Sequence, residues 1–227
     1  IGAASDSNGT VFKYETGRLA GATYSVTAGA DITSADGTVV HKKGASVGTI
    51  RTGDNGEGTL ANLHMGIYVI TETGSPANYV NKGESKTVTL TAGSTSADVT
   101  GTATFSNDRQ KAKVTVVKQD GTTQNPLSGG IFGLYAGADI KSADGKVIVP
   151  KDTFIEKATT GTDGSAVFKA DLPVNNSYYV KEIQAPKNYI RNQADTFSFS
   201  FNYTNEKQAE VAFSHTFINE RVDARID

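Results

Sequence analysis

Two glutamates in this chain lie in phase with residues that form protein cores. Glu182 shares one face of a predicted strand with Tyr178 and Val180, and Glu72 repeats this arrangement within the segment 68–72. A buried carboxylate without a partner is costly, so each glutamate needs a partner if it faces a core. An exposed carboxylate at a strand end is the simpler alternative for one glutamate. The same pattern in both halves of the chain favours a shared role.

A lysine and an asparagine show the same phasing in each half. In the second half, Lys118 alternates with Val114 and Val116, and Asn219 alternates with Phe217. The corresponding residues of the first half are Lys13 and Asn107. Three polar side chains in each half are therefore predicted to point toward a core that excludes isolated polar groups. The simplest resolution is that the lysine, glutamate and asparagine of each half meet.

A lysine, a glutamate and an asparagine held together in an apolar site can form a covalent bond. Burial lowers the pKa of a lysine amine, which becomes a neutral nucleophile, and raises the pKa of a glutamic acid, which can then donate a proton. The amine attacks the asparagine carbonyl with the assistance of Glu72 or Glu182, ammonia leaves, and an isopeptide bond results. The reaction runs once on the protein itself, so the sequence predicts no turnover enzyme, no cofactor and no metal.

Each predicted bond joins the first strand of its half to the last. The bonds close loops of 94 positions in the first half (107 − 13) and 101 positions in the second (219 − 118). By analogy with a disulfide that closes a loop of this length, each bond contributes roughly 4–5 kcal/mol in the chain-entropy model. An amide, unlike a disulfide, cannot be reduced.

The elements that carry these residues occur twice in the chain. Residues 19–32 return as 127–140, and the turn at 34–37 returns as 142–145. The period of about 110 residues is too long for a solenoid repeat and suits a compact domain. We therefore predict domains at 1–109 and 110–222 with a very short link, and we interpret 223–227 as the start of a following segment.

The composition predicts an all-β protein. The chain has 227 residues with 24 Gly, no Trp and no Cys, which is typical of short strands joined by many turns. The absence of cysteine excludes disulfides and zinc-thiolate sites. A net charge of −2 with scattered basic residues favours neither a nucleic-acid surface nor a polybasic membrane patch. The chain begins at Ile1 without an apolar leader, and we interpret it as a piece of a longer protein.

The second half resembles the B-type repeat domains of Gram-positive collagen adhesins and pilins, the Cna-B or SpaA-like domains. The matching segments are 116–120, 127–134, 160–168, 179–189 and 217–220. The resemblance implies two tandem prealbumin-like, inverse immunoglobulin-type β-sandwich domains and a bond between Lys118 and Asn219 that Glu182 promotes. The first half matches more loosely: the segment around Glu72 lacks the Ala-Pro pair, and Tyr14-Glu15 replaces the usual polar-Asp pair after Lys13.

The predicted function is structural. We expect a stiff stalk or shaft module of a Gram-positive adhesin or pilin, extracellular and attached to the cell wall through an anchor outside this fragment, with neighbouring domains of the same chain as partners. The alternative is an adhesin module that binds a host extracellular-matrix protein or a glycan. A glycosidase with paired carboxylates is disfavoured, because Glu72 and Glu182 fall in different predicted domains.

Overall fold

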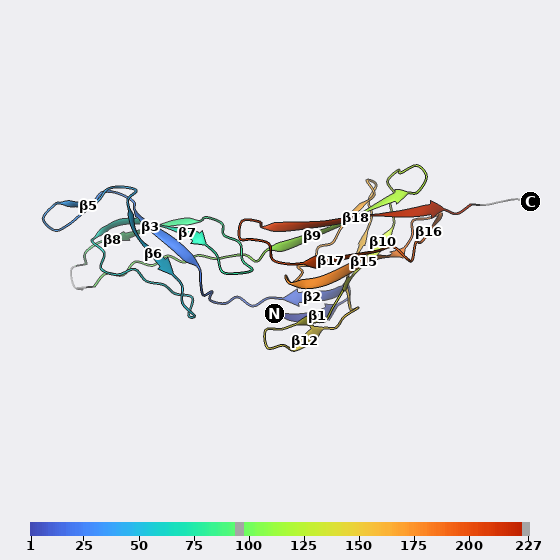
Figure 1. Ribbon diagram of the computed structural model, residues 1–227, viewed down its shortest axis with the longest axis horizontal. Helices are drawn as coiled ribbons and strands as arrows, with labels where there is room; N and C mark the ends of the chain where they lie inside the picture. The colour runs from blue at the N-terminus through green and yellow to red at the C-terminus, as the bar shows by residue number, and fades with distance from the viewer. Residues whose placement is uncertain (94–97, 224–227) are drawn as a thin grey trace, which may run out of the picture. The chain divides into compact units, whose positions relative to one another are not determined.

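The computed structural model describes residues 1–93 and 98–223, and every regular element within them is a β-strand (Figure 1). The chain divides into two compact units. The first domain comprises Thr16–Gln110 together with Asn205–Ala209. The second domain comprises Ile1–Glu15, Lys111–Thr204 and the described residues from Glu210 onward. The all-β prediction is confirmed.

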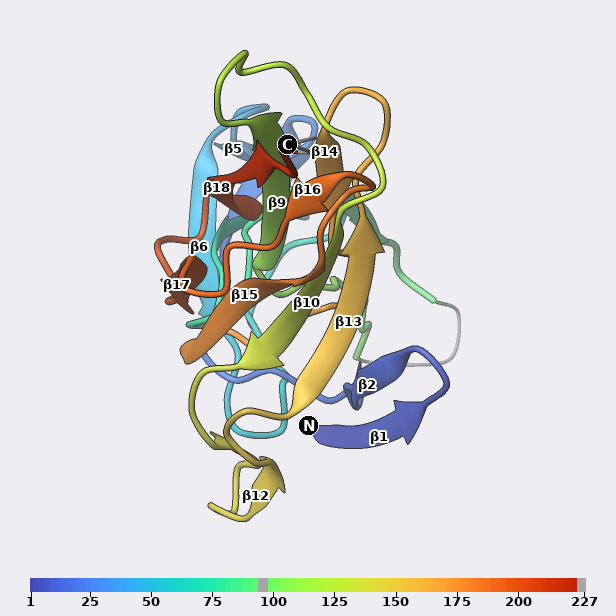
Figure 2. The same ribbon diagram turned by 90° about the vertical axis from the view of Figure 1, so that its right-hand side faces the viewer.

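The second domain is a sandwich of two four-stranded sheets. One sheet has the order β13-β10-β15-β17, with β10 between β13 and β15 in Figure 2. The other has the order β14-β9-β18-β16, in which β9 and β18 run parallel. The bounds of the first sheet are β13 (Phe154–Thr159), β10 (Ile131–Ala136), β15 (Asn176–Gln184) and β17 (Thr196–Phe201). Those of the second are β14 (Ser165–Val167), β9 (Lys111–Asp120), β18 (Glu210–Arg221) and β16 (Tyr189–Ile190). A small hairpin adds β11 (Ile140–Lys141) and β12 (Val147–Val149).

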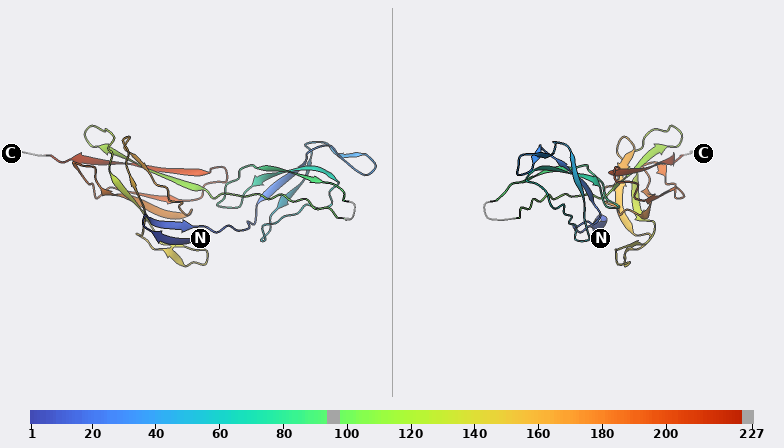
Figure 3. Two further views of the ribbon diagram at one scale, coloured as in Figure 1. Left: turned by 180° about the vertical axis from the view of Figure 1, so that it is seen from behind. Right: turned by 60° about the vertical axis from the view of Figure 1, so that its left-hand side comes forward.

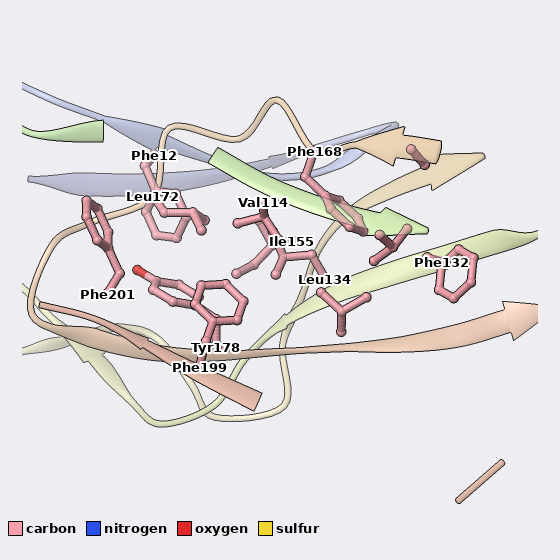
Figure 4. Packing of buried hydrophobic residues seen from close by; sticks show 14 of the residues in the cluster. Phe12, Val114, Phe132, Leu134, Ile155, Phe168, Leu172, Tyr178, Phe199 and Phe201 are labelled. Atoms are coloured by element: carbon pink, nitrogen blue, oxygen red, sulfur yellow. The ribbon is translucent and has the colours of Figure 1, made fainter. Parts of the chain in front are cut away.

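Alternating side chains of both sheets fill one core. Val114 and Val116 of β9 meet Leu134 of β10 and Val180 of β15 in a single cluster of buried apolar residues. Figure 4 shows the part of this cluster around Leu134, Tyr178 and the neighbouring aromatic rings. The period of two along each strand places most polar residues of the same strands outside the core.

The first 15 residues belong to the second domain in the structure, whereas the predicted boundaries assigned them to the first. They form an antiparallel hairpin of β1 (Gly2–Asp6) and β2 (Gly9–Lys13). Phe12 is 8% exposed and joins the second-domain core, where Figure 4 shows it beside Leu172. The Thr10 hydroxyl donates a hydrogen bond to the Phe154 carbonyl at 2.8 Å. Burial of the Phe12 ring gives the hairpin a physical reason to lie there.

The first domain contains one four-stranded sheet of order β6-β3-β7-β8. Its strands are β6 (Ser46–Arg51), β3 (Thr23–Ala28), β7 (Gly66–Gly74) and β8 (Ser85–Leu90), and a small hairpin adds β4 (Ile32–Thr33) and β5 (Val39–His41). The core of this domain is built on Val26, Ala28, Ile32 and Tyr68. Residues 98–107, which correspond to β18 of the second domain, contain no named strand. The Phe105 ring nevertheless packs against Tyr24 of β3 at a centroid separation of 4.7 Å.

Candidate crosslinking site

Lys118 is fully buried in the second domain. It lies on β9, where every second residue from Val114 to Asp120 points inward. Its side chain is 0% exposed, and its Nζ lies 3.7 Å from Oε1 of Glu182. Burial lowers the pKa of the Lys118 amine, and the nearby Glu182 partly offsets this effect. The neutral, nucleophilic form of the Lys118 amine is therefore more favourable at this buried position than it is for a lysine exposed to water.

Glu182 contacts both Lys118 and Asn219, and the three side chains come from three different strands. Glu182 lies on β15 of the opposite sheet and is 4% exposed. Asn219 lies on β18, which runs parallel to β9 with Phe217 opposite Lys118; views from opposite sides show these two strands adjacent (Figures 1 and 3). The Asn219 Nδ2 group donates hydrogen bonds to Glu182 Oε2 at 2.9 Å and to the Ile190 carbonyl at 2.6 Å.

Each of the three side chains keeps one buried polar atom without a hydrogen bond. These atoms are Lys118 Nζ, Glu182 Oε1 and Asn219 Oδ1, and none has a hydrogen-bond partner among the described residues. A buried polar group without a partner costs about 1–3 kcal/mol. Aromatic packing beside the site, with the rings of Phe132 and Phe217 4.7 Å apart, supports a dry environment. The unreacted arrangement therefore carries a cost in unsatisfied polar atoms, and a bond between lysine and asparagine would remove part of that cost.

The first domain repeats two of these three positions. Glu72 of β7 is 4% exposed and accepts a hydrogen bond from Asn107 Nδ2 at 2.6 Å. The same Nδ2 group donates to the Val80 carbonyl at 3.1 Å, as Asn219 does to Ile190. The predicted meeting of glutamate and asparagine therefore has the same geometry in both domains.

Comparison with known families places both domains in one group. A family profile described as SpaA, prealbumin-like fold domain, matches residues 8–104 and again 112–215. The chain belongs to this family. It carries two tandem SpaA-type domains, and the predicted prealbumin-like fold is confirmed. The sequence matches no curated protein.

Solved structures with a similar chain trace include the Bacillus anthracis TIE protein, with 24% identity and a TM-score of 0.53. The match covers 92% of this chain and 32% of that one, so the chain spans about a third of the TIE structure. The shaft pilin SpaA of Lactobacillus rhamnosus GG matches over 95% of this chain and 94% of its own, with 16% identity and a TM-score of 0.37. The minor pilin GBS52 of Streptococcus agalactiae matches over 96% and 90%, with 17% identity and a TM-score of 0.36.

Lys13 lies on β2 in the second domain, whereas Glu72 and Asn107 lie in the first. The first SpaA-type match begins at residue 8 and so includes Lys13, but β2 lies in the second domain. There Lys13 is exposed and pairs with Gly2 across the hairpin. The neighbouring Phe12 holds the strand by entering the second-domain core. The bond between Lys13 and Asn107 stays a prediction.

Sequence reasoning missed the backbone groups that orient the asparagines of the SpaA-type domains. The Ile190 and Val80 carbonyls each accept a hydrogen bond from an asparagine Nδ2 group. Both follow the tyrosine that ends the repeated Pro-x-Asn-Tyr segment, so the repeat was a usable signal for their position. No side-chain pattern could have shown that the carbonyl points toward the asparagine.

Within the described residues, no helix has the length and apolar character of a membrane span.

Proposed function

We propose that this chain is a structural module of a Gram-positive surface protein or pilin, in which Lys118 and Asn219 become joined by an intramolecular isopeptide bond that Glu182 promotes. The observation that carries the proposal is the buried group of three side chains. Lys118 Nζ lies 3.7 Å from Glu182, and Glu182 accepts a hydrogen bond from Asn219 at 2.9 Å. A buried lysine, glutamate and asparagine at these distances have all the groups that the reaction needs.

The reaction balances within these three residues. Lys118 Nζ forms a bond to Asn219 Cγ, and the bond between Asn219 Cγ and Nδ2 breaks. The amine gives one proton to Glu182, Glu182 gives a proton to the departing Nδ2, and ammonia leaves. Glu182 ends in its starting protonation state, and no oxidant, reductant or external substrate takes part. The domain modifies itself once.

The bond would reinforce the pairing of β9 with β18 in the second domain. β9 and β18 pair in parallel from Lys111 opposite Glu210 to Asp120 opposite Asn219. The bond closes a loop of 101 positions (219 − 118), worth roughly 4–5 kcal/mol in the chain-entropy model. A force applied at Lys111 and at Arg221 would then pass from β9 to β18 through a covalent bond. This is the mechanical property that a stalk or shaft requires.

The wider biological role rests on membership of the SpaA-type family, whose profile matches both domains. SpaA is also the name of the shaft pilin of Lactobacillus rhamnosus GG. We therefore place this chain at the surface of a Gram-positive cell, with neighbouring domains or pilin subunits as its partners. Cell-wall anchoring belongs to the same proposal. For the first domain, the proposal includes a second bond between Lys13 and Asn107 with Glu72 assisting.

The intact mass of the denatured chain tests this proposal. The wild type should weigh less than its sequence by one ammonia if only the second domain reacts, and by two if both react. Glu182→Ala should prevent the loss of one ammonia mass. Glu72→Ala should prevent the loss of a second ammonia mass only if the first domain reacts. Glu220→Gln is the matched control, because Glu220 is an exposed carboxyl next to Asn219. A wild-type mass equal to the plain sequence would refute the crosslink.

A further inference from the structure

A second buried carboxylate lies directly beside the crosslinking site and has no role in the reaction described above. The Asp120 side chain is 2% exposed. Its Oδ2 accepts hydrogen bonds from the Tyr189 hydroxyl at 2.6 Å and from Arg221 Nε at 3.0 Å. Its Oδ1 accepts from the backbone N–H groups of Thr122 and Thr123 at 2.9 and 2.8 Å. We call Asp120, Tyr189 and Arg221 the carboxylate clamp.

Each member of the carboxylate clamp is a near neighbour of a group in the crosslinking site. Asp120 lies two residues after Lys118 on β9, and Arg221 lies two residues after Asn219 on β18, so each pair shares a strand face. Tyr189 directly precedes Ile190, whose carbonyl accepts the hydrogen bond from Asn219 Nδ2. The clamp therefore connects the three segments that present the lysine, the asparagine and the orienting carbonyl.

The segment that most needs this connection is β16. It is a strand of only two residues, paired with β18 at Tyr189–Arg221 and at Ile190–Glu220. In the sheet order, β18 separates β16 from β9. The Tyr189 hydroxyl reaches past β18 to Asp120 on β9 and so ties the outer strand to the strand that carries Lys118. Hydrogen bonds from Tyr189 and from the backbone keep the pKa of Asp120 well below its usual range, so the acceptor stays ionised.

We propose that the carboxylate clamp positions the leaving group of the crosslinking reaction. The clamp holds the Ile190 carbonyl in place, and this carbonyl in turn holds Asn219 Nδ2 beside Glu182. The two hydrogen bonds of Nδ2 hold the Asn219 amide plane in one orientation, which keeps its Cγ in a fixed position for attack by Lys118. Without the clamp, β16 can move away and the amide loses one of its two hydrogen bonds. Asp120, Tyr189 and Arg221 are positioning residues, because none of them touches the reacting atoms. This inference rests on the proposed isopeptide reaction.

The first domain offers an internal comparison. Tyr79 and Arg109 form the bridge that corresponds to Tyr189 and Arg221, and Asn107 donates to the Val80 carbonyl. The residue that corresponds to Asp120 is Glu15, which belongs to the second domain in the structure. The first domain therefore repeats the tyrosine, the arginine and the orienting carbonyl of the second domain.

The test measures the rate of ammonia loss in the full chain. The chain is synthesised in a cell-free reaction, samples are quenched in denaturant at intervals, and the reacted fraction is read by mass spectrometry. Tyr189→Phe removes one hydroxyl and should slow the second-domain bond about tenfold or more, since a hydrogen bond to a buried charge is lost. Asp120→Asn should slow it similarly, and Arg221→Gln, at an exposed position, should slow it less. Tyr79→Phe is the matched control and should leave this rate unchanged.

A second measurement separates positioning from simple loss of folding. In a Lys118→Met background, which cannot react, the folded fraction and the hydrogen exchange of the Asn219 side-chain amide are followed by NMR. Positioning predicts that Tyr189→Phe leaves the chain folded while the Asn219 amide protons lose protection. The inference would be overturned if Tyr189→Phe slowed ammonia loss only in proportion to a fall in the folded fraction, while the Asn219 amide protons kept their protection from hydrogen exchange.

Wild-type-like rates in both Tyr189→Phe and Asp120→Asn would also overturn the inference, and would leave the isopeptide reaction itself intact. If the wild type loses no ammonia at all, both the proposed function and this inference fall.

Discussion

Replacing Lys118 with methionine should destabilise the second domain by preventing the proposed covalent bond while keeping the packing. Methionine has nearly the length of the lysine stem and fills irregular apolar space well, and Lys118 is fully buried between the two sheets. The Glu182–Asn219 hydrogen bond at 2.9 Å can persist in this variant. The Lys118→Met variant therefore measures the contribution of the proposed bond to stability separately from that of the core packing.

The expected magnitude follows from the loop that the bond closes. A loop of 101 positions (219 − 118) corresponds to roughly 4–5 kcal/mol in the chain-entropy model. For a domain of this size, that loss lowers the melting temperature by roughly 15–25 °C. Glu182→Ala should be less stable still by about 1–3 kcal/mol, because it leaves the unreacted Lys118 amine buried without its partner. The predicted order of stability is wild type, then Lys118→Met, then Glu182→Ala.

Scanning calorimetry of the three proteins, with intact masses measured on the same samples, provides the assay. The wild type must show the ammonia loss and both variants must lack it for the comparison to be valid. Equal melting temperatures for the second domain of wild type and Lys118→Met would refute the entropic reasoning. A Glu182→Ala variant that is more stable than Lys118→Met would show that the buried amine costs nothing, contrary to the geometry of the site.

Three further changes test other parts of the structure. Phe217→Ala removes a ring that is 1% exposed and packs on Phe132, so urea denaturation should show a loss of about 3–5 kcal/mol, and mass spectrometry should show slower crosslinking as water enters the site. Burial raises the pKa of Tyr178 above its ordinary value near 10, so the folded state holds this proton more tightly than the unfolded state does. Stability should therefore fall as the pH rises above about 10, and urea midpoints should show a smaller fall in Tyr178→Phe, which contains no ionisable hydroxyl. Gln110→Ala removes a fully buried amide that donates to the Gln208 carbonyl at 2.7 Å, so proteolysis within 205–209 should become faster, and unchanged cleavage would contradict the role of this contact.

The side chains of the second-domain site could be anticipated from the sequence because period-two alternation is a strong local signal. Lys118, Glu182 and Asn219 each continue an apolar face, and the structure brings all three together. The same alternation extends from Lys118 to Asp120, so the buried clamp carboxylate was visible in principle. It was not recognised, because an aspartate at the end of a strand equally suits an exposed turn.

The placement of the N-terminal strand could not be obtained in the same way. The repeat shows that residues 10–15 correspond to the end of β9, but a repeat identifies equivalent segments and does not say which surface each one covers. Phe12 can be buried by any sandwich with space in its core, and in the structure that core is the one around Leu172.

The parallel pairing of β9 with β18 could not be predicted from local patterns either, because alternation is the same for parallel and antiparallel neighbours.

The positions of Lys118 and Asn219 near the ends of β9 and β18 have a topological consequence. Once joined, the residues from 118 to 219 form a closed ring, with the rest of the chain attached as two tails on adjacent parallel strands. A protease that cuts one exposed loop of such a ring opens it without producing two fragments. The nicked domain would still migrate as one covalent species under denaturing conditions, and its cut ends would remain held by the same two sheets. A surface protein built this way can suffer a single cleavage in each ring and keep its outer part attached.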